Sequence, residues 1–169
     1  MHPNAETIRR FYACFAARDA EGMAACYGTE VVFRDPVFGE LRGRRAGDMW
    51  RMLAGRAVDL KVDVSGVEAD DARGKARWVA TYKFGPKARP VRNVIDARFA
   101  FHDGLIVRHE DSFDFWRWSA QALGPAGSLL GWTPMLQARV RRNALGGLDR
   151  FQRGAAQHEA TKARSHQGS

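Results

Sequence analysis

Several acidic residues lie in segments rich in strand-forming residues, and one of them lies close to a histidine. Asp35 stands before Pro36, Asp96 lies within the run VIDARF, and Asp111 follows His109 by two positions. Carboxyl and imidazole groups are the side chains that most often transfer protons in enzymes. Residue type alone makes Asp35, Asp96, His109 and Asp111 candidate catalytic residues.

Carboxylates gathered in one apolar cavity have a specific chemical use. Burial and mutual repulsion raise the pKa of at least one carboxyl group, while a neighbouring Arg98 or His109 lowers the pKa of another. A general acid and a general base then coexist at neutral pH. This pair could move a proton on carbon beside a carbonyl group, or activate water, without any cofactor.

Each of these residues also has a purely structural interpretation. Asp35 could simply form the turn at Pro36, because Asp is a common turn residue. Asp96 could form an ion pair with Arg98 or Arg92. A shift of one residue in the last strand would turn His109 and its partner to the solvent.

Metal and disulfide chemistry have little support in the sequence. The His-x-Asp spacing is common in strands, so we expect no metal site. Cys14 and Cys26 lack the Cys-x-x-Cys spacing, and we expect two buried, reduced thiols.

Helical periodicity is clearest near the two ends of the chain. A helix is predicted from Asn4, then a short one from Asp19 to Tyr27, a third over Asp48–Arg56 and a basic amphipathic one over Pro134–Phe151. The face of the first helix consists of apolar and aromatic side chains: Ile8, Phe11, Tyr12 and Phe15.

Strand patterns dominate the middle of the chain. A short strand precedes Asp35, and alternation of apolar and polar residues runs from Val58 to the mid-110s. The last two strands, over 92–102 and 105–116, meet at Asp103-Gly104, a strong hairpin signal. Helices followed by a meander of long strands predict an α+β fold.

Charge and composition divide the chain into three parts. Residues 1–117 have 20 Lys or Arg against 17 Asp or Glu, and residues 118–169 have seven against two. We predict one α+β domain over 1–117, a basic helical extension over 118–153 and a disordered tail over 154–169. No specific nucleic-acid binding is expected, whereas the basic helix could contact an anionic membrane surface. The start of the chain lacks the apolar core of a secretory signal, so a cytoplasmic protein is expected.

Three segments in order carry a resemblance to a known superfamily. They are ARDAEGMAACYGTEVVFRDPVFGELRG (17–43), NVIDARFAFHDGLI (93–106) and VRHEDSFDFW (107–116). Over roughly residues 5–117 the chain resembles the ketosteroid isomerase branch of the nuclear transport factor 2-like superfamily, which includes SnoaL-like polyketide cyclases and limonene epoxide hydrolases. The resemblance implies a curved mixed or antiparallel sheet wrapped around N-terminal helices, forming a cone with an internal pocket.

The resemblance also implies roles for individual residues. Asp35 matches the family's general base and Asp96 its oxyanion-stabilising acid. If Asp96 faces the pocket, Arg98 does too, because positions two apart in a strand share a face. The family's oxyanion tyrosine falls on Phe11, which departs from the steroid isomerase pattern. The residues expected to contact substrate are Phe11, Tyr12, Phe15, Trp50, Arg98 and Phe113.

The function implied is an isomerase or cyclase that acts by proton transfer on a small apolar carbonyl compound. Two alternatives stay open: water activation of the epoxide hydrolase kind, and a non-catalytic ligand-binding or interaction module. An apolar cavity holding two or more buried carboxylates would favour an enzyme, and a filled cone would favour a module. We also expect a homodimer.

Overall fold

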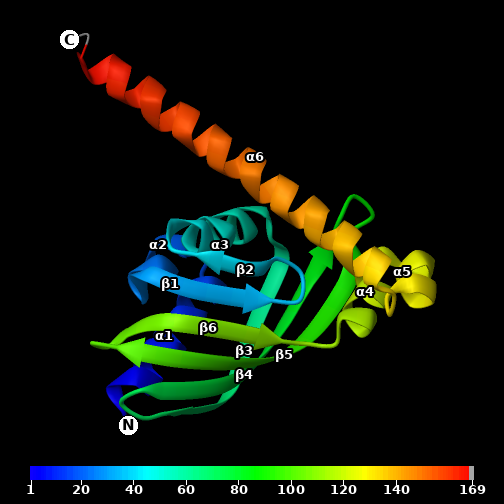
Figure 1. Cartoon of the computed structure of the whole chain (residues 1–169), viewed down its shortest axis with the longest axis horizontal. Helices are drawn as coiled ribbons and strands as arrows, with labels where there is room; N and C mark the ends of the chain where they lie inside the picture. Colours follow the sequence, from blue (N-terminus) through cyan, green and yellow to red (C-terminus); the bar gives the residue numbers. More distant parts are fainter. Residues whose placement is uncertain (168–169) are drawn as a thin grey trace.

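A six-stranded mixed sheet forms the frame of the molecule in the computed structural model, which describes residues 1–167 (Figure 1). The strands are β1 (Tyr27–Asp35), β2 (Gly39–Arg42), β3 (Val58–Ala69), β4 (Arg73–Phe84), β5 (Arg89–His102) and β6 (Leu105–Ser112). The helices are α1 (Pro3–Ala16), α2 (Ala20–Ala25), α3 (Arg44–Arg56), α4 (Phe115–Leu123), α5 (Pro125–Leu130) and α6 (Pro134–Gln167). The α+β prediction is confirmed.

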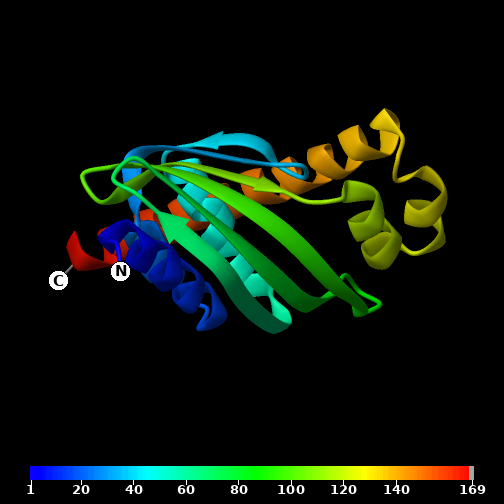
Figure 2. The ribbon, with the colours of Figure 1, turned by 90° about the horizontal axis from the view of Figure 1, so that it is seen from below.

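The strand order is β2-β1-β6-β5-β4-β3. The β1–β6 pair is parallel and the other neighbours are antiparallel, so the sheet is mixed. The sheet curves over α1 and α3 as in a cone (Figure 2). Asp103 and Gly104, with φ angles of 49° and 77°, make the predicted hairpin between β5 and β6.

The core lies between the concave face of the sheet and the N-terminal helices. On α1 the predicted apolar face is buried, and Ile8, Phe11, Tyr12 and Phe15 are each at most 5% exposed. Asp19 caps α2, as predicted, by accepting a hydrogen bond from the Gly22 backbone N–H.

The C-terminal helix α6 is longer than predicted. It spans 34 residues and crosses α3 before it extends past the domain (Figure 1). The expected disordered tail is therefore wrong for residues 154–167, which continue the helix, whereas 168–169 lie outside the described residues. Leu148 on α6 is fully buried in the main core.

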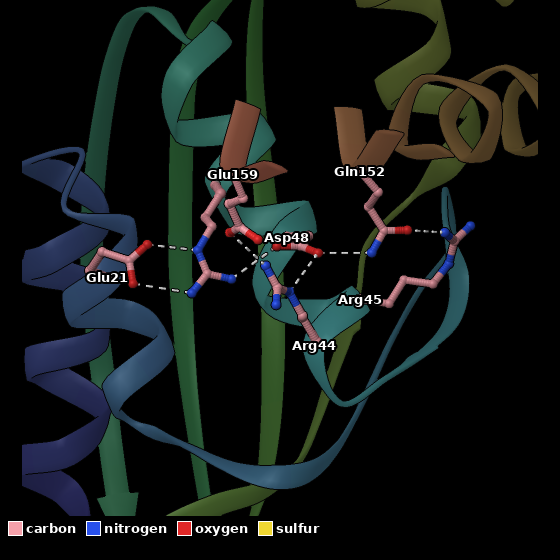
Figure 3. Close-up of polar contacts among 7 residues, drawn as sticks. Glu21, Arg44, Arg45, Asp48, Gln152 and Glu159 are labelled. Atoms are coloured by element: carbon pink, nitrogen blue, oxygen red, sulfur yellow. Dashed lines mark hydrogen bonds and ion pairs between the residues drawn. The ribbon is translucent and has the colours of Figure 1, made fainter. Parts of the chain in front are cut away.

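A polar cluster joins α6 to α3 (Figure 3). Asp48 is buried, and its Oδ2 accepts a hydrogen bond of 2.8 Å from the Gln152 side chain. Arg51 approaches the other oxygen of Asp48 at 3.1 Å, and Arg45 donates to Gln152 at 2.7 Å. Because the buried carboxylate has donors on both helices, this cluster fixes α6 against α3.

Within residues 1–167, every helix is too short or too polar to cross a membrane.

Candidate functional site

A cavity of about 530 Å³ opens between the concave face of the sheet and helices α3, α4 and α6. Its wall is mostly aromatic and aliphatic. Polar groups line it from several elements: Asp35, Arg56, Tyr82, Lys83, Asn93, Asp111, Asn143 and Arg150. An apolar cavity with a few converging polar groups is the usual form of a small-molecule site.

Asp35 reaches the cavity from the last position of β1. Its Oδ1 accepts hydrogen bonds from the backbone N–H groups of Val37 (2.9 Å) and Phe38 (2.6 Å). The turn that Pro36 imposes therefore orients the carboxyl group. Within residues 1–167, Oδ2 accepts no hydrogen bond, so any proton on Asp35 resides on the oxygen left for a ligand.

The surroundings of Asp35 change its acidity. Burial raises the pKa of Asp35 from 3.8 to about 7, and the charge of Asp111 adds to this increase. The two backbone N–H donors and Arg141 act in the opposite direction. A carboxyl group with a pKa near 7 is partly ionised at neutral pH, which suits a group that both takes and returns a proton.

Asp111 lines the same cavity from β6 and is held by two ring N–H groups. His109 Nε2 lies 2.9 Å from its Oδ1, and the Trp78 indole N–H approaches the same oxygen at 3.4 Å. The prediction that His109 and Asp111 share an inward face is correct. His109 is fully buried and is not among the residues that line the cavity, so it reaches the site only through its contact with Asp111.

A chain of hydrogen bonds fixes the tautomer of His109. The Trp50 indole N–H donates to the Tyr27 hydroxyl oxygen at 2.8 Å, and the Tyr27 hydroxyl lies 2.8 Å from His109 Nδ1. Because an indole N–H can only donate, the Tyr27 hydroxyl is free to donate to Nδ1. This leaves the hydrogen on Nε2, where it points to Asp111.

Two further polar groups in the cavity can serve as hydrogen-bond donors. The Trp118 indole N–H donates to the Tyr82 hydroxyl oxygen at 2.9 Å, which leaves the Tyr82 hydroxyl proton available. Asn93 on β5 points inward, and within residues 1–167 its side-chain amide forms no hydrogen bond. Both side chains line the cavity together with Asp35.

Asp96 and Arg98 lie on the opposite face of the sheet, and the prediction that they face the pocket is wrong. The inward positions of β5 are Val91, Asn93, Ile95, Ala97, Phe99 and Phe101, and the residues between them face outward. Asp96 forms an exposed ion pair of 2.8 Å with Arg77 on β4, which lowers the pKa of this carboxyl group. Asp96 therefore forms a structural ion pair, as its alternative interpretation predicted, although the partner is neither Arg98 nor Arg92.

The aromatic residues predicted to contact substrate divide into two groups. Phe15, Trp50 and Phe113 line the cavity. Phe11 and Tyr12 instead lie in the packed core beneath it. The Tyr12 hydroxyl is the one fully enclosed side-chain polar atom in residues 1–167 without a hydrogen-bond partner, so it does not replace the missing oxyanion tyrosine.

Sequence reasoning missed four residues of the site: Tyr27, Tyr82, Asn93 and Trp118. The alternation along β5 could have identified Asn93, since the more apolar set of alternate residues includes it and leaves out Asp96. Trp118 had no such signal, because its role depends on α4 folding back over the cavity.

In the part of the chain that the structure describes, no group of three or more His, Cys, Asp or Glu side chains is arranged to hold a metal ion. The two cysteines are both free there, with Cys26 buried and Cys14 partly exposed.

Solved structures share this fold at low sequence identity. An LEH-like epoxide hydrolase from M. tuberculosis matches with a TM-score of 0.62 and 22% identity over 76% of this chain and 95% of that one. A Catenulispora acidiphila protein with a ketosteroid isomerase-like fold, in complex with trimethylamine, matches with a TM-score of 0.64 and 14% identity over 76% and 98%. TerC, co-crystallised with polyporic acid, matches with a TM-score of 0.58 and 20% identity over 67% and 92%.

A search of curated proteins found no match. The model of the SnoaL-like domain family matches residues 8–109, which is more than half of the chain and includes Asp35 and β1 to β5. The chain therefore belongs to the SnoaL-like domain family.

Proposed function

We propose that the protein is an enzyme that transfers a proton on carbon beside a carbonyl group of a small, largely apolar compound. The observation that carries the proposal is that Asp35 and Asp111 both line one apolar cavity, where burial brings the pKa of Asp35 to about 7. A protein that only bound an apolar ligand would gain nothing from burying two carboxyl groups in its cavity, because their burial is costly. An open cavity with two carboxylates thus supports an enzyme over a binding module.

In the proposed mechanism, Asp35 is the general base. Its Oδ2 takes the proton from carbon, and negative charge develops on the carbonyl oxygen of the ligand. The Tyr82 hydroxyl and the Asn93 amide are the donors that would stabilise this oxygen, in place of the tyrosine and aspartate of the steroid isomerases. Asp35 then returns the proton to another carbon of the ligand, which completes an isomerisation. In a cyclisation, the carbanion instead attacks a second carbonyl carbon of the same ligand, the C=O π bond opens, and the resulting alkoxide takes the proton back from Asp35.

Asp111 has a supporting role in this mechanism. Its negative charge disfavours ionisation of Asp35, so it keeps the pKa of Asp35 close to neutrality. His109 and Trp78 hold its Oδ1 away from the ligand. Asp111 is therefore a positioning and electrostatic residue, and Asp35 is the catalytic one.

Deuterium exchange tests the proposal without knowledge of the natural substrate. Small cyclic ketones such as 2-cyclohexenone would be incubated with the protein in D₂O, and incorporation of deuterium beside the carbonyl would be followed by NMR. We expect exchange above the buffer rate, reduced at least tenfold in Asp35→Asn, because loss of one general base typically costs 10²–10⁴-fold. Asp96→Asn is the matched control and should exchange like the native protein.

The same experiment separates the alternatives. An alternative outcome is that the protein hydrolyses an apolar epoxide such as limonene oxide and shows no exchange with ketones. If Asp35→Asn abolishes that hydrolysis, the function is water activation and not proton transfer on carbon. If the protein catalyses neither reaction with a panel of ketones and epoxides but still binds apolar ligands, a binding module is favoured.

A further inference from the structure

The opening of the cavity differs in charge from its interior. Asp111 is buried and Asp35 half-buried, whereas the lining residues Arg56 at the end of α3 and Arg150 on α6 are exposed. Exposed lining residues mark the side on which the cavity meets the solvent. A ligand in the cavity therefore has carboxyl groups at one end and guanidinium groups at the other.

The two guanidinium groups lie close together across Gly147. A Cβ atom built on Gly147 would stand 3.6 Å from Nη1 of Arg56 and 3.9 Å from Nη2 of Arg150. Because both nitrogens lie within 4 Å of the same point, the two like charges repel each other unless an anion lies between them. Within residues 1–167, neither guanidinium has a carboxylate oxygen within 4.0 Å or any hydrogen bond to the protein.

The third cavity-lining cation and the acidic neighbour of Arg150 are already paired with other side chains. Lys83, which also lines the cavity, pairs with Asp59 at 3.0 Å, and Asp149, next to Arg150, pairs with Arg45 at 2.8 Å. Arg56 and Arg150 are thus the cavity-lining cations that remain available to a ligand. Guanidinium groups bind carboxylate, sulfate and phosphate oxygens through paired N–H donors.

We propose that the substrate is an apolar carbonyl compound with an anionic group at one end, which Arg56 and Arg150 bind at the opening while the carbonyl group lies near Asp35. This inference rests on the proposed function, because it assigns the substrate class of the same cavity. The anionic group also fixes the orientation of the ligand, since the carboxylates at the inner end repel it.

A pair of fluorescent probes that differ only in a sulfonate tests this proposal. 1-Anilinonaphthalene-8-sulfonate carries the anion, and N-phenyl-1-naphthylamine lacks it. In the double variant Arg56→Gln/Arg150→Gln we expect the dissociation constant of the sulfonate to rise at least tenfold and that of the neutral probe to change less than twofold. Arg153→Gln/Arg164→Gln, which removes the same charge farther along α6, should leave both constants unchanged.

Three results would overturn the proposal. They are an unchanged affinity for the sulfonate in the cavity variant, an equal loss of affinity for both probes, and an equal loss in the control variant. Deuterium exchange is measured in Arg56→Gln/Arg150→Gln as well. If this variant still catalyses exchange and the exchange still depends on Asp35, the proposed function stands even if the anion site fails. Absence of binding of both probes to the native protein would contradict the apolar cavity and both proposals together.

A separate apolar corner lies outside the cavity, where α4, α5 and the start of α6 meet at one end of the molecule (Figure 1). Its large side chains are between 49% and 76% exposed: Trp116, Leu129, Leu130, Trp132 and Met135. The corner is rigidly built, since the Trp116 indole N–H donates to the Ser128 carbonyl at 2.8 Å and Trp132 donates to the Leu129 carbonyl at 3.1 Å.

The segments that form the apolar corner are rich in arginine, although Asp114 caps α4 two positions before Trp116. Residues 115–148 contain four arginines and no Asp or Glu. Arg139 and Arg142 follow Met135 by four and seven positions, so they continue the same face of α6. Exposed Trp and Leu side chains beside arginines are typical of segments that lie in the interface of anionic membranes.

We infer that this corner docks on an anionic lipid surface. Sedimentation with vesicles tests it: we expect binding to phosphatidylcholine vesicles that contain 30% phosphatidylglycerol and little binding to phosphatidylcholine alone. Leu129→Ser/Trp132→Ser should lower the bound fraction at least fivefold, whereas Leu105→Ser, an exposed apolar residue of the distant hairpin, should not. Failure to sediment with the anionic vesicles would overturn the inference. A dimer that Leu129→Ser/Trp132→Ser converts to a monomer would also overturn it, in favour of a second copy as the partner.

Discussion

The pKa of the Asp35 carboxyl group is subject to two opposing influences. The turn after β1 supplies two backbone N–H donors to Oδ1, and Arg141 also favours the ionised form, whereas the apolar cavity and Asp111 disfavour it. Burial outweighs the donors, and the pKa rises to about 7. The same side chain would be an ordinary acidic turn residue if α3 and α6 did not enclose it.

The raised pKa of Asp35 predicts a dependence of stability on pH. Between about pH 4 and 7 the folded state holds a proton that the unfolded chain releases, so the contribution of Asp35 to the free energy of unfolding falls as pH rises through this range. Asp35→Asn removes this dependence. Relative to the native protein, the variant should gain roughly 2–4 kcal/mol of stability between pH 4.5 and pH 8 in urea unfolding.

Asp96→Asn is the control for this comparison. Its carboxyl group has a pKa lowered by Arg77, so its contribution is present above its unfolded pKa and is lost as pH falls. The difference between this variant and the native protein should be small, because the ion pair is exposed, and of the opposite sign. A stability difference for Asp35→Asn that does not change with pH would contradict the raised pKa.

Removal of the hydroxyl group should have opposite effects on stability at two buried tyrosines. Tyr27 links Trp50 to His109, so Tyr27→Phe leaves a buried donor and acceptor unpaired and should lower the free energy of unfolding by about 1–3 kcal/mol. The Tyr12 hydroxyl has no partner within residues 1–167, so Tyr12→Phe should be neutral or stabilise by up to about 1 kcal/mol. Urea unfolding of both variants measures the contrast, and equal losses would contradict the hydrogen-bond chain.

At the scale of elements, the alternation of side chains between the two faces of a strand determines which polar residues reach the site. On β6 the prediction that His109 and Asp111 point inward is correct. On β5 the expectation followed the family resemblance, although the alternation of Ile95, Ala97 and Phe99 with charged residues indicates the opposite face for Asp96. Where the apolar–polar alternation of a strand and a family match disagree, the alternation shows which residues of this chain are buried.

The helix α6 acts as a wall of the cavity. Its residues Val140, Asn143, Ala144 and Gly147 follow the spacing of one helical face and line the cavity. Periodicity predicted the first half of this helix. It could not show where the helix packs, because that depends on contacts such as Asp48–Gln152 between residues more than 100 positions apart.

Leu148 tests the packing of α6. It is fully buried in the main core, so Leu148→Ala should lower the free energy of unfolding by about 2–4 kcal/mol. Leu129→Ala, at an exposed position, should change it by less than about 0.5 kcal/mol. Similar values for the two variants in urea unfolding would show that α6 does not pack on the core as described.

At the scale of the whole molecule, the family domain and the rest of the chain build one site together. The family match covers residues 8–109, yet Trp118, Val140 and Arg150 contribute to the cavity wall. Residues on both sides of the predicted boundary at 117 therefore line the same cavity. The resemblance predicted the cone and the position of Asp35, but it could not predict residues supplied by segments outside the family domain.

Titration of the Asp35 carboxyl group tests the central claim most directly. In protein labelled with ¹³C at aspartate, the side-chain carboxyl signal of Asp35 is assigned by its loss in Asp35→Asn and followed from pH 3 to pH 9. We predict a midpoint near pH 7, shifted to lower pH in Asp111→Asn because a neighbouring negative charge is removed. A midpoint near pH 4 in the native protein, insensitive to Asp111→Asn, would contradict a general base placed in an apolar cavity.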